Sequence, residues 1–161
     1  MLNSNERLDR IKHYLAQYVT QINLGNDVGL FDGAKMLELF AQEVCRIWFC
    51  QEFNNLNLIQ NDYPYVDLVS YDKKIYVQVT TAKDLNTKIR ETLKKISEST
   101  EPVFQEIRNL YFFVHEVPVD INIINRIGKN RIGSINFDAG THLITAQKIY
   151  ETGKRMRYSS R

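Results

Sequence analysis

The sequence has 161 residues, of which 43% are hydrophobic and 25% charged, and glycine and proline together number only ten. This composition fits one globular domain and excludes a disordered, collagen-like or low-complexity chain. The formal net charge is +2, but residues 121–161 hold eight basic and two acidic side chains, while residues 1–120 hold thirteen basic and seventeen acidic ones. A basic C-terminal part is typical of a solvated terminus and also of a surface that faces a polyanion.

The sequence contains no run of about eighteen apolar residues, so we expect no membrane span. The first seven residues lack the apolar stretch of a secretory signal, and we therefore expect a cytoplasmic protein. In that reducing compartment Cys45 and Cys50 are expected to be free thiols. They lie five residues apart on one expected helix, where they point to different faces and do not easily bridge.

Two helices are expected in the first third of the chain. Apolar residues recur every three or four positions from Leu8 to Ile22, which predicts an amphipathic helix over 4–23 with Asn3, Ser4 or Asn5 as its cap. The Gly-Asn-Asp sequence at 25–27 is expected to end this helix. A second helix over 34–53 is apolar over a wide arc and should pack on the core. A polar connection follows over 54–62.

The next segment predicts a β-hairpin. Residues 65–70 and 74–81 are rich in β-branched and aromatic side chains and flank a turn centred on Asp72 and Lys73. With that turn, Asp67 faces Gln78 across the two strands. Side chains alternate between faces along a strand. We expect one apolar face to pack on the helices and the other, which carries Asp67, Gln78 and Thr80, to be open.

The rest of the chain continues the alternation of helices and strands. We expect a helix capped by Asn86 or Thr87 and ending at 99–101, a central strand over 109–117, a short helix over 120–127, a strand over 133–137 and a last helix over 141–152. This order predicts a single α/β (α+β) domain with a mixed central sheet flanked by helices. Its parts are a helical part (1–53), a hairpin-helix-strand core (63–117) and a basic part (118–161).

Asp67, Gln78 and Thr80 are the first candidates for chemistry. A carboxylate beside an amide oxygen is a suitable oxygen ligand set for Mg²⁺, which keeps several waters and takes one or two carboxylates. Such an ion activates water and stabilises the charge on a phosphate under attack. A plain hydrogen bond between Asp67 and Gln78 is by far the commoner arrangement for such a pair. Both interpretations stay open on spacing alone.

Other candidates surround this pair in the sequence. Glu38 and Glu43 are five residues apart on the second helix, so at most one of them points at a given site. Lys83 and Lys88 follow the hairpin, and a cation in the first turn of a helix, as at Lys88, is mildly unfavourable to the helix dipole. The three histidines and two cysteines show no zinc-ligand spacing, and no phosphate-binding glycine loop or nucleophile elbow is present.

At this point the sequence resembles known families. Pro64-Tyr65-Val66-Asp67, followed after ten residues by Gln78-Val79-Thr80, resembles the active-site hairpin of the PD-(D/E)XK nuclease superfamily, which has a restriction-endonuclease-like core. More closely, residues 4–115 resemble the bacterial SMEK domain, and the likeness is loose from 118 onward. The segments that carry this likeness are Leu8-Asp9-Arg10-Ile11, His13-Tyr14-Leu15-Ala16, Tyr18-Val19-Thr20, Val28-Gly29-Leu30-Phe31-Asp32, Asn54-Asn55-Leu56-Asn57, Lys88-Ile89 and Thr92-Leu93-Lys94-Lys95.

The resemblance implies a role for each matching residue. Asp67 takes the place of the metal-binding aspartate, Gln78 that of the second acidic ligand, and Glu38 that of the acid on the preceding helix, while the Val79 carbonyl completes the metal ligands. Thr80 stands where the superfamily usually has its lysine, and a hydroxyl supplies no positive charge. Lys88, with Lys83 second, is placed to substitute for that lysine from the following helix.

The expected function is therefore Mg²⁺- or Mn²⁺-dependent cleavage of DNA, in a bacterial defence or mobile-element setting. Phosphates would be held by the side chains of Arg90, Lys94, Lys95, Arg126, Lys129 and Arg131. The departures at Gln78 and Thr80 favour a first alternative, a nuclease-fold module that binds nucleic acid without cleaving it. A second alternative is a protein-interaction or sensing subunit that forms a homodimer through its first helix.

Overall fold

The structure is a computed structural model that describes residues 3–28, 33–59, 64–72, 74–114 and 121–145, together with residues 148 and 151. The chain divides into two compact units. The helical unit comprises residues 1–53 and 146–161, and the sheet unit comprises residues 54–145. The expected helical part over 1–53 ends at the same residue as the first segment of the helical unit.

The helical unit contains α1 (Ser4–Val28) and α2 (Gly33–Phe49). A reciprocal cap begins α1: Asn3 Oδ1 accepts from the Glu6 N–H at 2.9 Å, and the Asn3 N–H donates to Glu6 Oε2 at 2.8 Å. This is the capping box expected where an Asn precedes a Glu by three residues. The expected end at 25–27 is wrong, because α1 continues through these residues to Val28. A single glycine costs a helix only about 1 kcal/mol and does not by itself stop it.

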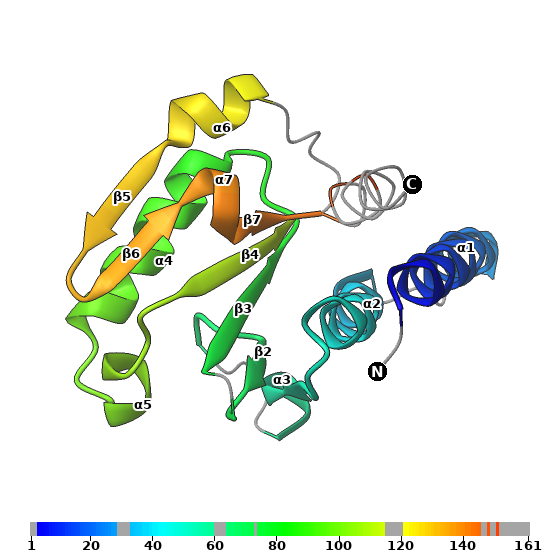
Figure 1. Cartoon of the computed structure of the whole chain (residues 1–161), viewed down its shortest axis with the longest axis horizontal. Coiled ribbons are helices and arrows are strands. Elements are labelled where there is room, and N and C mark those ends of the chain that lie inside the picture. The colour runs from blue at the N-terminus through cyan, green and yellow to red at the C-terminus, as the bar shows by residue number, and fades with distance from the viewer. Residues whose placement is uncertain are drawn as a thin grey trace. The chain divides into compact units, whose positions relative to one another are not determined.

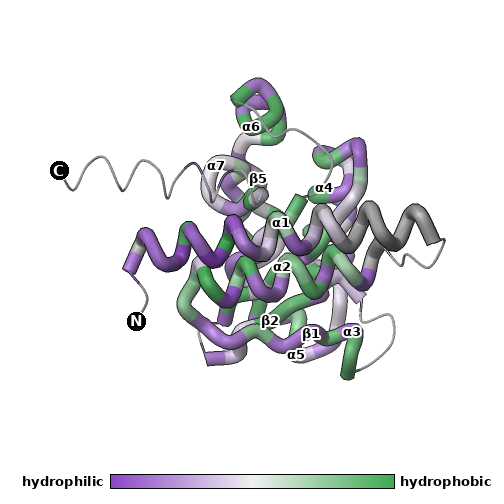
Figure 2. The backbone as a smooth tube through the Cα atoms, turned by 90° about the vertical axis from the view of Figure 1, so that its right-hand side faces the viewer, coloured by the Kyte–Doolittle hydropathy of each residue, from purple (hydrophilic) through white to green (hydrophobic). Residues whose placement is uncertain are grey.

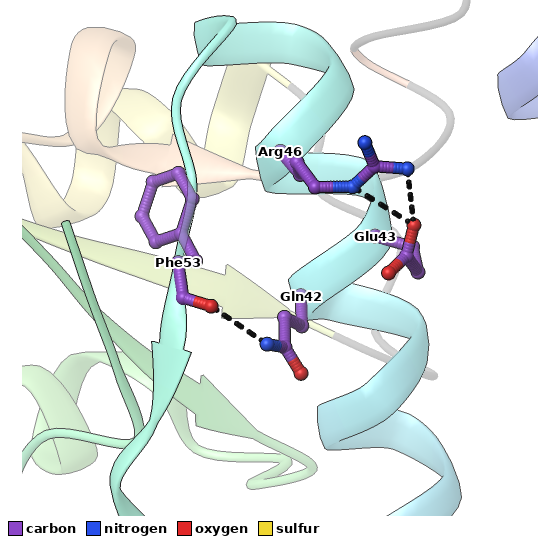
Figure 3. Close-up of polar contacts among 4 residues, drawn as sticks. All are labelled: Gln42, Glu43, Arg46 and Phe53. Atoms are coloured by element: carbon purple, nitrogen blue, oxygen red, sulfur yellow. Dashed lines mark hydrogen bonds and ion pairs between the residues drawn. The ribbon is translucent and has the colours of Figure 1, made fainter.

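Hydrophobic and hydrophilic stretches alternate along both helices (Figure 2). Tyr18 of α1 stacks on Phe40 of α2, with ring centroids 4.5 Å apart. Helix α2 ends four residues before the expected Phe53, since Cys50 adopts a positive φ of 52°. The side chain of Gln42 then donates to the carbonyl of Phe53 at 2.7 Å and ties the departing chain to the helix (Figure 3). Both cysteines are free, as predicted, with Cys45 buried and Cys50 exposed.

The sheet unit is built on a mixed five-stranded sheet in the order β1-β2-β3-β4-β7 (Figure 1). The pairs β1–β2 and β2–β3 are antiparallel, whereas the pairs β3–β4 and β4–β7 are parallel. The strands of this sheet are β1 (Asn54–Asn55), β2 (Leu68–Ser70), β3 (Ile75–Thr80), β4 (Leu110–Val114) and β7 (Leu143–Ile144). A separate hairpin pairs β5 (Lys129–Ile132) with β6 (Ile135–Asp138).

Helices connect these strands. They are α3 (Leu56–Ile59), α4 (Leu85–Glu98), α5 (Pro102–Gln105), α6 (Ile121–Ile127) and α7 (Ala139–His142). The mixed α/β class with helices around a mixed sheet is confirmed, and so is the short helix near 120–127. The expected cap of α4 is wrong: Asp84 caps it, and its side chain accepts from the backbone N–H of Thr87. Strand β4 is described to Val114, so the expected end of this strand at 117 lies outside the described residues.

The predicted hairpin register is confirmed, because Leu68 pairs with Val77 and Val69 with Tyr76. The expectation that the Asp67 face of the hairpin is open is wrong. Val69 and Tyr76, which share that face, belong to the same buried core cluster as Ile89 of α4. Residues four and seven apart along α4 present an apolar face, and this face covers the sheet where sequence reasoning left it exposed.

The C-terminal part departs most from expectation. The strand expected at 133–137 is β6, and its partner β5 was not predicted. Gly133 turns this hairpin at a φ of +60°, where a Cβ atom would lie 2.9 Å from the Cβ of Ser97 on α4. The helix expected over 141–152 is wrong at its start, since Leu143 and Ile144 form β7 beside β4. No described helix is both long enough and apolar enough to span a membrane.

Candidate functional site

The hairpin brings Asp67 to the point where three segments of the sheet unit meet. Its backbone N–H donates to the Val77 carbonyl at 2.9 Å, and its own carbonyl accepts from the Leu56 N–H at 2.8 Å. Asp67 therefore lies at the beginning of β2, between β3 and the β1–α3 segment. The side chain is 7% exposed, so a carboxylate is held in the interior of this unit.

Three N–H groups surround the Asp67 carboxylate. Oδ1 accepts from Asn57 Nδ2 at 2.9 Å, and Oδ2 accepts from Gln78 Nε2 at 2.7 Å and from the Val79 backbone N–H at 2.6 Å. Burying a charge is costly unless it is paired or hydrogen-bonded. Donors on both oxygens meet that requirement, and they tie β2 to β3 and to α3. We call Asp67, Asn57, Gln78 and Val79 the aspartate clamp.

The amide of Gln78 faces Asp67 through its nitrogen. Nε2 donates to the carboxylate and also lies 3.2 Å from the Val79 carbonyl oxygen. Because both neighbours are acceptors, the nitrogen and not the oxygen belongs on this side of the amide. The Val79 carbonyl is likewise engaged by a donor. The cross-strand hydrogen bond considered from the sequence is thus the arrangement that the structure contains.

These residues do not fit a metal centre as they are arranged. A divalent cation needs oxygen ligands directed at it, whereas the Asp67 oxygens accept from nitrogen donors and Gln78 presents its nitrogen. Among the described residues, no group of three or more His, Cys, Asp or Glu side chains is placed to hold a metal ion.

Thr80 ends β3 and shapes the turn that follows. Its side chain is 5% exposed, and Oγ1 accepts from the Ala82 backbone N–H at 3.0 Å. This local bond is typical of a hydroxyl that stabilises a turn. The two lysines expected to replace the missing cation lie beyond it, with Lys83 exposed in the turn and Lys88 half-buried in the first turn of α4.

The helix-borne acids belong to the helical unit. Glu38 is half-buried on α2. Glu43, one turn further, accepts from both Nε and Nη2 of Arg46, at 3.1 and 2.8 Å (Figure 3). The hydrogen bond with Glu43 raises the pKa of the Arg46 guanidinium. Glu43 is thus held by an ion pair within its own helix.

Most of the cations expected to contact phosphate lie on the surface of the sheet unit. Arg90, Lys94 and Lys95 are exposed on α4, and Lys94 Nζ lies 3.9 Å from Glu98 Oε1. Lys129 of β5 is exposed, with its Nζ 3.8 Å from Asp138 Oδ2. Arg126 is exposed at the end of α6. The side chain of Arg131 lies outside the described side chains.

A cavity of about 450 Å³ lies between the β3–α4 turn and α6. It is lined by Lys83, Asp84, Leu85, Asn86, Ile123, Arg126 and Ile127. Backbone and side-chain hydrogen bonds from Thr87 lower the pKa of Asp84, and the nearby Arg126 charge acts in the same direction.

Sequence reasoning placed Lys83 and Arg126 separately and missed Asn86. It also missed Asn57, whose only signal was its place in the Asn54-Asn55-Leu56-Asn57 segment. Both asparagines gain a candidate role only through contacts between distant parts of the chain.

Comparison with known proteins identifies a family and no individual relative. The family model described as the SMEK domain matches residues 10–154. This match reaches well beyond residue 115 and includes most of the basic C-terminal part, up to residue 154, where the likeness is loose in the sequence alone. No curated protein and no solved structure matches the chain.

Proposed function

The chain belongs to the SMEK domain family, and from this premise we propose that it binds nucleic acid without cleaving it. We place it in the restriction-endonuclease-like superfamily as a non-cleaving member. Support for that placement comes from the order of elements, in which a helix, the β2–β3 hairpin, α4 and the parallel strand β4 follow one another. It also comes from the position of Asp67 at the start of the hairpin.

The aspartate clamp is the main support for the proposal that the domain does not cleave nucleic acid. A cleaving site of this superfamily requires an aspartate whose oxygens are open to a metal. Here both oxygens of Asp67 accept from N–H groups, at 2.6 to 2.9 Å. Cleavage by this superfamily usually needs a lysine at the position of Thr80, which supplies only a hydroxyl. The oxygen of that hydroxyl accepts a hydrogen bond from the Ala82 backbone N–H.

The cations of α4 and its neighbours support nucleic-acid binding. Ile89 and Leu93 are buried, so the opposite side of α4 presents Arg90, Lys94 and Lys95 to solvent. The hairpin strand β5, which carries Lys129, packs against α4. Helix α4 has four basic and two acidic side chains, a net charge of +2. Phosphate contacts of this kind are independent of sequence and sensitive to salt.

Fluorescence anisotropy with a labelled DNA duplex and a labelled single strand tests the proposal. We expect the affinity to fall steeply with salt, with each phosphate contact adding about 0.9 to the slope of log K against log salt for a duplex. The double variant Lys94→Ala/Lys95→Ala should lower that slope by about 1 to 2. The matched control is Lys12→Ala, an exposed helix lysine outside the sheet unit. The proposal fails if the chain does not bind DNA at low salt, or if the control and the double variant behave alike.

Metal-dependent cleavage by the same domain is the competing proposal, and it keeps Asp67 and Gln78 in metal-binding roles with Mg²⁺ or Mn²⁺ as cofactor. It requires the Gln78 amide to turn over and the hydrogen bond to Asp67 to break. Incubation of DNA with the chain in Mg²⁺ and in Mn²⁺ separates the two: intact DNA agrees with binding alone, whereas cleavage that is lost in Asp67→Ala would establish the competing proposal.

A further inference from the structure

The cavity between the β3–α4 turn and α6 lies beyond the ends of two central strands of the sheet. Strand β3 ends at Thr80 and leads into the turn with Lys83, and α6 follows β4, the parallel neighbour of β3. The cavity is therefore built from segments that follow the carboxyl ends of two adjacent parallel strands. Its volume of about 450 Å³ falls within the range of small-molecule sites.

One residue that lines the cavity, Asn86, carries a buried acceptor that lacks a donor. The side-chain oxygen Oδ1 of Asn86 is buried and has no hydrogen-bond partner among the described residues. Nearly all buried polar side-chain atoms in proteins are hydrogen-bonded, so an orphaned acceptor in a cavity wall calls for an explanation. A ligand that brings an O–H or N–H group to this point supplies the missing donor.

The remaining lining groups define the rest of the ligand. Lys83 and Arg126 supply two exposed cationic groups, from the turn and from α6. The Asp84 carboxylate is already occupied, since it accepts from the backbone N–H and the hydroxyl of Thr87 at 3.2 and 2.8 Å. These bonds leave the Asp84 charge in place, so the lining holds two cations and one carboxylate, a net charge of +1 that still favours an anionic group. Leu85, Ile123 and Ile127 provide an apolar wall.

We propose that this cavity binds a nucleoside monophosphate unit, present either as a free nucleotide or as the 5′ end of a strand. The phosphate contacts Lys83 and Arg126, a sugar hydroxyl or base amino group donates to Asn86 Oδ1, and the base lies on the apolar wall. The choice of a nucleotide among phosphorylated ligands rests on the proposed function. The cavity itself requires only an anion, a donor and an apolar face.

Calorimetric titration of the full chain with the four deoxynucleoside 5′-monophosphates, with deoxyadenosine and with inorganic phosphate tests the chemistry. We expect at least one monophosphate to bind, with deoxyadenosine and phosphate at least about tenfold weaker, because each lacks part of the contacts. Arg126→Ala should weaken the nucleotide and phosphate alike. Lys12→Ala is the control, since Lys12 is an exposed cation outside the lining. Equal affinity for nucleotide and phosphate would overturn the proposal.

The variant Asn86→Ala gives a signature that loss of folding does not. It should weaken nucleotide binding about tenfold through the lost hydrogen bond, and it should raise the melting temperature of the free protein by removing the orphaned acceptor. Asn122→Ala is the control, because Asn122 is the second residue of α6 just as Asn86 is the second residue of α4. A rise in melting temperature with unchanged nucleotide affinity in Asn86→Ala would overturn the proposal.

Oligonucleotides distinguish the source of the ligand. If the 5′ end of a strand occupies the cavity, a 5′-phosphorylated single strand should bind better than its 5′-hydroxyl counterpart, and Asn86→Ala should abolish the difference. Nucleotide binding without any oligonucleotide binding would support the cavity and refute the proposed function. Salt-sensitive oligonucleotide binding without a 5′-phosphate preference and without nucleotide binding would refute the cavity proposal and leave the proposed function standing.

Discussion

Replacing the buried aspartate by its neutral isostere tests the aspartate clamp directly. In Asp67→Asn the amide oxygen replaces only one of the two carboxylate oxygens. Placed at Oδ2, it keeps neutral hydrogen bonds from Gln78 and Val79, whereas the new NH₂ group faces the Asn57 donor and that bond is lost. A bond to a charged group contributes about 1.5–3 kcal/mol and a neutral one about 0.5–1.5 kcal/mol. With two bonds weakened and one lost, the free energy of unfolding should fall by at least about 3 kcal/mol. For a chain of this length the melting temperature should fall by about 6–12 °C.

Urea unfolding followed by circular dichroism gives this free energy, with an unchanged slope expected if only stability is altered. Asp72→Asn is the matched control, because Asp72 is exposed in the hairpin turn, and such surface changes stay within about 0.5 kcal/mol. If Asp67 were instead an uncompensated metal ligand, removing its charge would leave stability unchanged or raise it. An Asp67→Asn variant as stable as the original chain would therefore refute the clamp.

A double-mutant cycle isolates one bond of the clamp. Asn57→Ala removes the donor to Oδ1 of Asp67, which lies 2.9 Å away. Residues that share a hydrogen bond are coupled, so Asn57→Ala and Asp67→Asn together should cost less than the sum of the two single changes. Additive effects would show that the Asn57 bond contributes nothing.

Three further predictions concern other parts of the fold. A thiol reagent should modify Cys50 in the native chain and reach Cys45 only in urea, because Cys45 is buried and burial raises the pKa of its thiol. Mass spectrometry measures the modification, and equal modification rates of the two thiols in the native chain would contradict this prediction. Asp84→Ala should lower the melting temperature at neutral pH. Because a carboxylate with a depressed pKa stabilises the fold only while it is ionised, the difference from the original chain should vanish as the pH falls through the lowered pKa of Asp84. A difference in melting temperature that persists at low pH would contradict this prediction. In thermal unfolding, Gly133→Ala should destabilise the fold by about 1–3 kcal/mol more than Gly128→Ala. Both glycines have a φ of +60°, but only at Gly133 does a Cβ collide with α4. Equal losses of stability in the two variants would contradict this prediction.

The sequence was sufficient for features set by local periodicity. The hairpin register followed from alternation on both sides of one turn, and the structure pairs Leu68 with Val77 as that alternation requires. The sequence offered Asn3, Ser4 or Asn5 as the cap of the first helix, and the structure places the cap at Asn3, the first of the three. Both features depend on residues within a few positions of each other, where local geometry leaves few choices.

Features that depend on distant contacts were not predictable. Strand β7 has two residues and no periodicity, and it forms only because β4 offers an edge. The burial of the Asp67 face depends on α4, which begins fifteen positions after β2 ends at Ser70. No local pattern reveals how this helix packs. Asn57 and Asn86 look like ordinary loop and helix residues until the fold places one beside a carboxylate and the other in a cavity wall.

The central claim is that this domain holds nucleic acid and leaves it intact, and one titration tests it most directly. A labelled DNA is titrated with the chain in Mg²⁺ and in EDTA under the same ionic strength, and the DNA recovered from each complex is sized on a denaturing gel. The account predicts binding in both buffers, no tighter in Mg²⁺ than in EDTA, and full-length DNA in both. Binding that requires the metal, or DNA shortened in Mg²⁺ by the original chain and not by Asp67→Ala, would contradict it.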